Sequence, residues 1–184
     1  ENTLQRMRLG GIFDHIGYGF HRYSTDQEWL VPHFEKMLYD QAMLTIAYTE
    51  AFQITGNKLY QNIAEEILDY VNRDMTDDRG GFYSAEDADS EGEEGLFYIW
   101  TLKELEKIIN EEDLLFLKEI YNLDASGNFK DEASGQFTGN NIFHLNGSIN
   151  DKSKIKRIKK INQTLFKNRE KRIHPLKDDK ILTD

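Results

Sequence analysis

Cysteine is absent from this chain of 184 residues. The chain therefore forms no disulfide bond, performs no thiol chemistry and offers no thiolate ligand to zinc. The absence fits a reducing compartment, and we expect a cytoplasmic protein. No apolar run approaches the roughly twenty residues that span a bilayer. No signal peptide is recognisable at the first residues, so we expect no membrane partner.

Positive charge is also scarce, because 23 Lys and Arg stand against 33 Asp and Glu, a net charge of -10. This balance argues against generic binding to nucleic acid, which needs a basic surface. Residues 152–172 are nonetheless rich in Lys and Arg, whereas residues 86–94 are strongly acidic. We interpret the basic segment as the solvated side of a helix rather than as a docking surface.

Apolar periodicity predicts two consecutive helices. The first covers residues 35–55, with Pro32 near its first turn and Gly56 after its end. Its apolar residues run nearly all round, so we expect it to be buried on most sides. The second covers residues 58–73 and has one apolar stripe, as a half-exposed helix does. Together they predict an αα-hairpin in a two-layer helical array.

The pattern changes after residue 80. Two short aromatic segments, 80–84 and 96–100, predict a small β-hairpin around the acidic loop. Thr101 and Glu104 form a capping box at the start of another helix. Further along we expect a helix over 112–121, loops over 122–150 and a last helix over 151–171. The prediction is a mainly α, single domain whose long loops carry function.

Titratable groups and aromatic rings are concentrated between residues 10 and 48. The groups expected to form a polar pocket there are Asp14, His15, His21, Arg22, Trp29, His33, Glu35 and Asp40. Taken singly, several have structural explanations: Glu35 as a helix-start carboxylate, and Lys36 with Asp40 as an ion pair four residues apart. Their density favours chemistry, because acid/base catalysis needs proton donors and acceptors close together. Rings interleaved with carboxylates also suit a sugar.

Other interpretations of these motifs are weaker. The segment Gly17–Gly19 lacks the third glycine and the βαβ setting of a dinucleotide site. The acidic loop from Asp87 mimics a calcium loop, but Tyr98 stands where a bidentate Glu is required. No two histidines have the helical spacing of a metal pair, so we predict neither a metal nor another cofactor.

Four long motifs resemble a known family. They are DHIGYGFHRYSTDQEWLVPHFEKMLYDQA, GGFYSAEDADSEGEEGLFYIW, GNF at 127–129 and RIHPLKDDKILTD. In this order they resemble thioredoxin-domain-containing proteins related to spermatogenesis-associated protein 20 and bacterial YyaL. Tyr18 departs from the pattern, since it stands where the family usually has a glycine. This change narrows the local turn or places a ring in the pocket.

The resemblance implies a fold. Such proteins carry an N-terminal thioredoxin-like domain followed by an α/α toroid of the six-hairpin glycosidase type, similar to that of N-acylglucosamine 2-epimerases. Residues 1–184 would then be a single partial domain, roughly the first half of the toroid. The thioredoxin-like domain and the C-terminal hairpins would be absent. We expect such a fragment to be inactive by itself and to self-associate through its exposed inner face.

Two functional hypotheses follow. The first is acid/base chemistry on a sugar. An epimerase-like reaction would use His21 or His33 as base, with Asp14 or Glu35 orienting or charging it. A glycosidase-like reaction would instead use two carboxylates, and the sequence does not choose that pair. In this first hypothesis the substrate-binding residues would be His15, Arg22, Trp29, Asp40, Asp87 and Asp89. The second is a non-catalytic module that binds a glycan or a protein for the attached thioredoxin-like domain. A third, purely structural role of the cluster also stays open.

Overall fold

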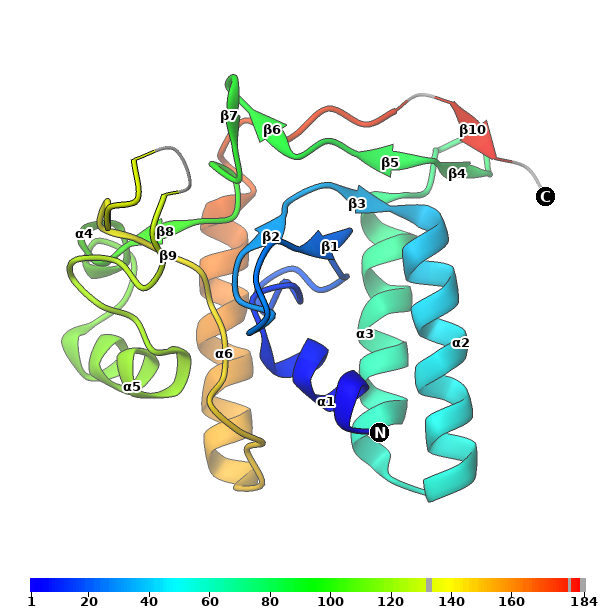
Figure 1. Cartoon of the computed structure of the whole chain (residues 1–184), viewed down its shortest axis with the longest axis horizontal. Helices are drawn as coiled ribbons and strands as arrows, with labels where there is room; N and C mark the ends of the chain where they lie inside the picture. Colours follow the sequence, from blue (N-terminus) through cyan, green and yellow to red (C-terminus); the bar gives the residue numbers. More distant parts are fainter. Residues whose placement is uncertain (132–133, 179, 183–184) are drawn as a thin grey trace.

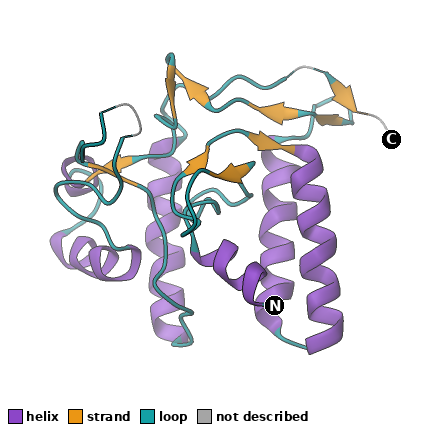
Figure 2. Cartoon of the chain, in the orientation of Figure 1, coloured by secondary structure: helices purple, strands orange, loops and turns teal. Residues whose placement is uncertain are grey.

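The computed structural model describes residues 1–131, 134–178 and 180–182. Within these residues the fold is mainly helical, with small antiparallel sheets of two strands each. The helices are α1 (Asn2–Leu9), α2 (Leu38–Thr55), α3 (Lys58–Asp74), α4 (Leu102–Glu106), α5 (Glu111–Tyr121) and α6 (Lys152–Arg169). Figure 2 shows that the strands gather at one end of the long helices, above α2, α3 and α6.

The hairpin of α2 and α3 forms as its local signals predict. Gly56 ends α2 in the left-handed conformation, at φ 69°, which glycine adopts without a Cβ penalty. Asn57 then caps α3 by accepting a hydrogen bond from the backbone N–H of Leu59. The predicted apolar stripe of α3 is buried, from Tyr60 to Val71.

The expectation that the first helix is buried on most sides is wrong. Of its residues, only Gln41 and Tyr48 are buried. Four large apolar side chains follow one face of the helix and form what we call the α2 stripe: Tyr39, Met43, Ile46 and Ile54, exposed by 51%, 64%, 52% and 84%. The apolar residues all round α2 therefore form two faces. One packs on the protein, and the other is not covered by any described residue.

The start of α2 also differs from the prediction. The helix begins at Leu38, because residues 32–37 are extended and form two strands instead, β2 (Pro32–His33) and β3 (Lys36–Met37). Strand β2 pairs with β1 (Tyr23–Ser24), and β3 pairs with β5 (Ala85–Glu86). Lys36 accordingly lies outside the helix and does not form the predicted ion pair with Asp40.

The predicted β-hairpin between 80–84 and 96–100 is wrong in its pairing. Strand β4 (Phe82–Tyr83) pairs with β10 (Ile181–Leu182), and the other aromatic segment ends in β8 (Trp100–Thr101), which pairs with β9 (Asn140–Asn141). A hairpin does form inside the acidic loop, from β6 (Asp89–Ser90) and β7 (Glu93–Glu94). The capping box of Thr101 and Glu104 is confirmed at the start of α4.

The core has three apolar clusters. One lies between α4, α5 and α6 around Leu105 and Leu165. A second lies between α3 and the segment 12–20, and a smaller third surrounds Phe34. Figure 1 shows α1 between α3 and α6, so the N-terminal segment separates the two halves of the helical layer. Among the described residues, no helix is both long and apolar enough to cross a bilayer.

Candidate functional site

The extended segment 32–36 divides the predicted site residues into two sets. Side chains alternate along extended backbone, so Pro32, Phe34 and Lys36 are buried while His33 and Glu35 lie between them at the surface. The two predicted catalytic pairs therefore occupy opposite sides of one strand-like segment. Asp14 and His21 lie on the inner side, and His33 and Glu35 lie on the outer side.

Asp14 is the centre of the inner side. It accepts a bidentate pair of hydrogen bonds from Arg169, each 2.8 Å long, and a further bond of 2.8 Å from the Lys36 ammonium. Its Oδ1 also accepts from the backbone N–H groups of Ile16 and Gly17. Glycine is required at position 17, because a Cβ there would lie 1.9 Å from the Arg169 guanidinium.

Burial and charge act in opposite directions on this cluster. Burial by itself would raise the pKa of Asp14, but the charges of Arg169 and Lys36 hold that pKa well below its usual value. Burial lowers the pKa of Lys36, while Asp14 and then Glu86 oppose the shift. The result is a buried set of charges fixed by short hydrogen bonds, which resists rearrangement.

His21 is held in this interior by its ring nitrogen. Its Nδ1 lies 2.8 Å from the Phe34 carbonyl oxygen, and a carbonyl only accepts, so Nδ1 carries the proton. Burial, and next the charge of Lys36, lower the pKa of His21 to about 3. Its ring meets those of Phe34 and Tyr98 edge to face. His21 is thus a neutral interior residue at physiological pH.

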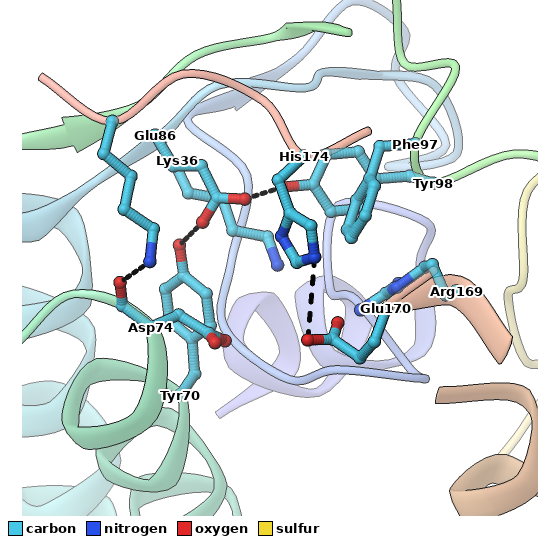
Figure 3. Close-up of a pocket in the computed structure, with 10 residues that line it drawn as sticks. Lys36, Tyr70, Asp74, Glu86, Phe97, Tyr98, Arg169, Glu170 and His174 are labelled. Atoms are coloured by element: carbon cyan, nitrogen blue, oxygen red, sulfur yellow. Dashed lines mark hydrogen bonds and ion pairs between the residues drawn. The ribbon is translucent and has the colours of Figure 1, made fainter. Parts of the chain in front are cut away.

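A cavity of about 150 Å³ adjoins the same cluster. Figure 3 shows the Glu86 carboxylate between two tyrosine hydroxyls, which donate to it from Tyr70 at 2.9 Å and from Tyr98 at 3.1 Å. The Lys36 ammonium lies over both rings. Positive and negative side chains balance in the lining: Lys36, Arg169 and Lys177 against Asp74, Glu86 and Glu170. The cavity therefore suits small uncharged polar molecules, water included.

The outer side carries what we call the rim cluster: Arg22, His33, Glu35, Asp40 and Glu94. His33 Nδ1 lies 2.7 Å from a Glu94 carboxylate oxygen, and its Nε2 lies 3.7 Å from Glu35. Arg22 donates to Glu35 at 2.7 Å. Strand pairing places the ring of Tyr23 opposite His33, and the two rings stack with centroids 5.0 Å apart. An accessible imidazole is thereby oriented by one carboxylate, with a second carboxylate near its other nitrogen.

Asp40 completes the rim cluster from the first turn of α2. Its Oδ2 is buried and has no hydrogen-bond partner among the described residues. Burial raises the pKa of Asp40, the charge of Arg22 opposes this, and Glu35 adds to it. The side chain is therefore poised to carry a proton at a higher pH than an ordinary aspartate does.

Two predicted substrate-binding residues lie elsewhere. His15 is buried, with Nδ1 3.0 Å from Arg8 and Nε2 3.0 Å from the Gly10 carbonyl oxygen. Burial, and next Arg8, lower the pKa of His15 well below its usual value. Trp29 adopts a left-handed φ of 65° and packs against the cluster between α3 and segment 12–20. Neither is among the residues of the rim cluster.

The acidic loop contributes to the rim cluster through a residue that sequence reasoning missed. Asp87 and Asp89 are exposed, and Asp87 accepts from the backbone N–H of Asp89. The loop acid that meets His33 is Glu94, which the β6–β7 register sets opposite Asp89. The many acids of the loop indicated that some carboxylate would reach the site, but only the pairing of short strands decides which one.

Lys36 and Arg169 are the other residues that sequence reasoning missed. Lys36 follows Phe34 by two positions, so strand alternation would have placed it inside. Arg169 stands in the basic segment interpreted as a solvated helix face, and its buried partner Asp14 is 155 residues away. Within the described part of the chain, no three His, Asp or Glu side chains are grouped so as to hold a metal ion.

Together these features define a mainly helical protein with a polar rim site at the N-terminal end of α2, the end of the α2–α3 hairpin opposite its connecting turn. No family model matches the chain. It is 45% identical over 165 residues to human spermatogenesis-associated protein 20 and 46% identical to the mouse protein, in each case over 80% of the chain and 21% of the relative. An uncharacterized protein of Caenorhabditis elegans is 32% identical over 209 aligned residues, covering the whole chain and 28% of that protein.

The relatives carry the family name that the motifs predicted, so the relationship to spermatogenesis-associated protein 20 is confirmed. The chain spans about a fifth of the length of the mammalian relatives that it matches.

Proposed function

We propose that this chain forms one wall of a sugar-directed site and supplies an acid/base residue to it, as in N-acylglucosamine 2-epimerases. The observation that carries the proposal is the rim cluster, in which His33 is accessible, oriented by Glu94 and stacked on Tyr23. Of the two candidate bases, His21 is enclosed, with its Nδ1 proton committed to a backbone carbonyl. His33 with Glu35 is thus the better supported pair.

The chemistry follows from the two nitrogens of His33. With the Nδ1 proton donated to Glu94, Nε2 is a free lone pair that takes a proton from the carbon next to a sugar carbonyl. Arg22 and Asp40 would bind hydroxyl groups, and the ring of Tyr23 would contact an apolar face of the sugar. The group that returns the proton from the opposite face would come from the rest of the longer family proteins.

The α/α toroid belongs to the same proposal. A long hairpin of α2 and α3 supports it, because the polar residues lie where the chain enters α2. The uncovered α2 stripe, against which a further hairpin would pack, supports it as well. An attached thioredoxin-like domain and a cytoplasmic location complete the proposal. The lack of cysteine in this segment is compatible with both.

The test is hydrogen exchange on sugars in D2O, using the protein at its full natural length. We expect loss of the proton signal at the carbon next to the carbonyl for an N-acylated aldose or a reducing disaccharide. His33→Gln should slow the exchange at least about 100-fold, as removal of a general base does, with sugar affinity changed less than about threefold. His174→Gln, a histidine outside the rim cluster, is the matched control and should leave the rate unchanged.

Two outcomes would count against the proposal. Equal exchange rates in the wild type and His33→Gln would remove His33 as the base. Sugar binding without any exchange would favour the alternative, a non-catalytic glycan-binding module. The 184-residue segment alone is expected to show no turnover.

A further inference from the structure

A second cavity lies on the opposite side of the N-terminal segment from the rim cluster and takes no part in the proposed function. Its volume is about 550 Å³, and its lining comes from α1, α3, α6 and the segment before α6. Figure 1 shows these elements converging around α1, between the long helices α3 and α6. We call this cavity the basic groove. Its volume falls in the range of about 300–1,000 Å³ that is typical of small-molecule sites.

One side of the basic groove is apolar. Leu59 and Ile63 line it from α3, and Ile155 and Ile158 line it from α6. The ring of Tyr18, the residue that departs from the family pattern, lines it too. Tyr18 holds a left-handed φ of 70°, the conformation that a glycine would otherwise favour. The departure thus adds an aromatic surface to this groove.

The charge of the groove is opposite to that of the protein. Three cations line it, Arg8, Lys152 and Lys159, with Glu66 as the single acid of the lining. Arg8 and Glu66 pair at 3.1 Å, while neither lysine forms an ion pair with any described residue. His15 adds no charge, because its pKa is lowered by burial. Two lysines without an ion pair among the described residues therefore line a half-apolar groove in a chain of net charge -10.

Two polar side-chain atoms of residues that line the groove also lack a hydrogen-bond partner among the described residues. Arg8 Nε and Asn162 Oδ1 are buried without a hydrogen-bond partner among the described residues. Both side chains also contact His15. The Arg8 guanidinium lies 3.0 Å from the ring Nδ1 of His15, and the Asn162 amide donates to the backbone carbonyl oxygen of His15 at 2.8 Å. Buried polar groups normally find partners, so Arg8 and Asn162 have unused capacity to bind a further polar group.

We propose that the basic groove binds an amphipathic organic anion, with its carboxylate between Lys152 and Lys159 and its apolar body along Leu59, Ile63 and Ile155. The charge selects an anion, and the apolar side selects a molecule with a hydrocarbon or aromatic body. Under this proposal, part of the basic segment 152–172 is a binding surface and not a solvated helix face.

The first experiment compares head groups on one apolar body. Decanoate, decanol and decyltrimethylammonium are titrated below their micelle concentrations into the chain by isothermal calorimetry. We expect decanoate to bind at one site per chain, at least about tenfold more tightly than the other two, because only a carboxylate gains from two nearby ammonium groups. Equal affinity for the three compounds, or no binding of decanoate, would overturn the proposal.

Paired charge variants on one helix locate the site. Lys152→Gln with Lys159→Gln should weaken decanoate binding at least about tenfold. Lys156→Gln with Lys160→Gln removes the same charge from exposed positions of α6 that do not line the groove, and should change the affinity less than twofold. An equal effect of both pairs would mean that net charge, not this groove, attracts the anion.

A third variant separates the groove from the α2 stripe. Asn62→Trp places a large ring in the groove from an exposed lining position and should abolish binding. Met43→Glu with Ile46→Glu alters the α2 stripe and should leave binding intact. If the stripe variant abolishes binding and Asn62→Trp does not, the ligand occupies the stripe and the proposal is wrong.

Discussion

At the scale of single residues, alternate positions of one extended segment separate a buried charge network from an accessible acid/base group. His21, whose Nδ1 bonds to the Phe34 carbonyl, shares the interior with Lys36, and burial and that charge keep its ring neutral. His33, one residue before Phe34, is half-buried and accessible at the rim cluster. Two histidines that look equivalent in the sequence therefore differ in their access to solvent.

The depressed pKa of His21 predicts a pH dependence of stability. The pKa of an unfolded histidine is about 6.5, whereas burial and the charge of Lys36 lower the pKa of His21 to about 3 in the folded chain. Between these values the unfolded chain binds the extra proton, so stability is full above pH 6.5 and falls progressively as the pH drops toward 3. His21→Gln, which keeps an N–H donor, should reduce the slope by about 1.4 kcal/mol per pH unit.

Urea unfolding between pH 6.5 and 4 measures this slope. Asp14 does not contribute to this slope. Because its pKa is lowered in the folded chain, the stability that Asp14 provides is lost only below about pH 4. The control is His174→Gln, whose half-exposed side chain should leave the slope unchanged. Identical slopes in the wild type and His21→Gln would refute the assigned protonation state.

The sequence predicted where polar residues are concentrated, but it did not predict which of their side chains are buried and which lie at the surface. The density of groups between residues 10 and 48 does mark two real clusters around Asp14 and His33. Assigning Lys36 to a helix hid the alternation that sends it inward to Asp14. Arg169 was beyond prediction from local sequence, because an ion pair across 155 residues depends on the whole fold.

At the scale of elements, the features that were predicted correctly rest on local chemistry. Gly56, Asn57 and the capping box at Thr101 each satisfy backbone groups within a few residues, so their effect is readable in sequence. The strand pairing predicted between 80–84 and 96–100 was wrong, because two-residue strands carry too little pattern to select a partner. The partner of Phe82–Tyr83 comes from the far end of the chain.

The α2 stripe predicts self-association of the 184-residue chain. Its four apolar side chains are exposed by half or more, an arrangement that monomeric proteins rarely leave uncovered. Met43→Glu with Ile46→Glu should shift the chain to monomer in sedimentation velocity, with the helix content by circular dichroism preserved. Gln53→Glu, an exposed position of the same helix outside the stripe, is the control. A wild type that stays monomeric up to about 100 μM would contradict the prediction.

At the scale of the whole molecule, the Asp14–Arg169 pair joins two apolar clusters. Asp14 lies between Phe13 of one cluster and Ile16 of the other, while Arg169 ends α6. The pair is 3–4% exposed, and breaking such a buried pair leaves a charge without its partner. We therefore expect the two clusters to unfold together only while the pair is intact.

Arg169→Met tests this coupling. It should cost about 3–5 kcal/mol, since Asp14 stays buried with Lys36 as its remaining cation. The two tryptophans report separately, Trp100 from the cluster of α4, α5 and α6 and Trp29 from the other. Urea midpoints followed in Trp29→Phe and Trp100→Phe backgrounds should coincide while Arg169 is present and separate once Arg169→Met is introduced. If the midpoints reported by Trp29 and Trp100 still coincide after Arg169→Met is introduced, the pair is not what couples the two clusters.

The extended segment from Pro32 to Lys36 also limits how this region tolerates changes of length. Removing or adding one residue there would exchange the two sides, placing the His33 and Glu35 positions inside and the Phe34 and Lys36 positions outside. The irregular segment 142–150 imposes no such alternation between two polar clusters. Insertions and deletions among natural variants should therefore accumulate in that later segment and be excluded from residues 32–36.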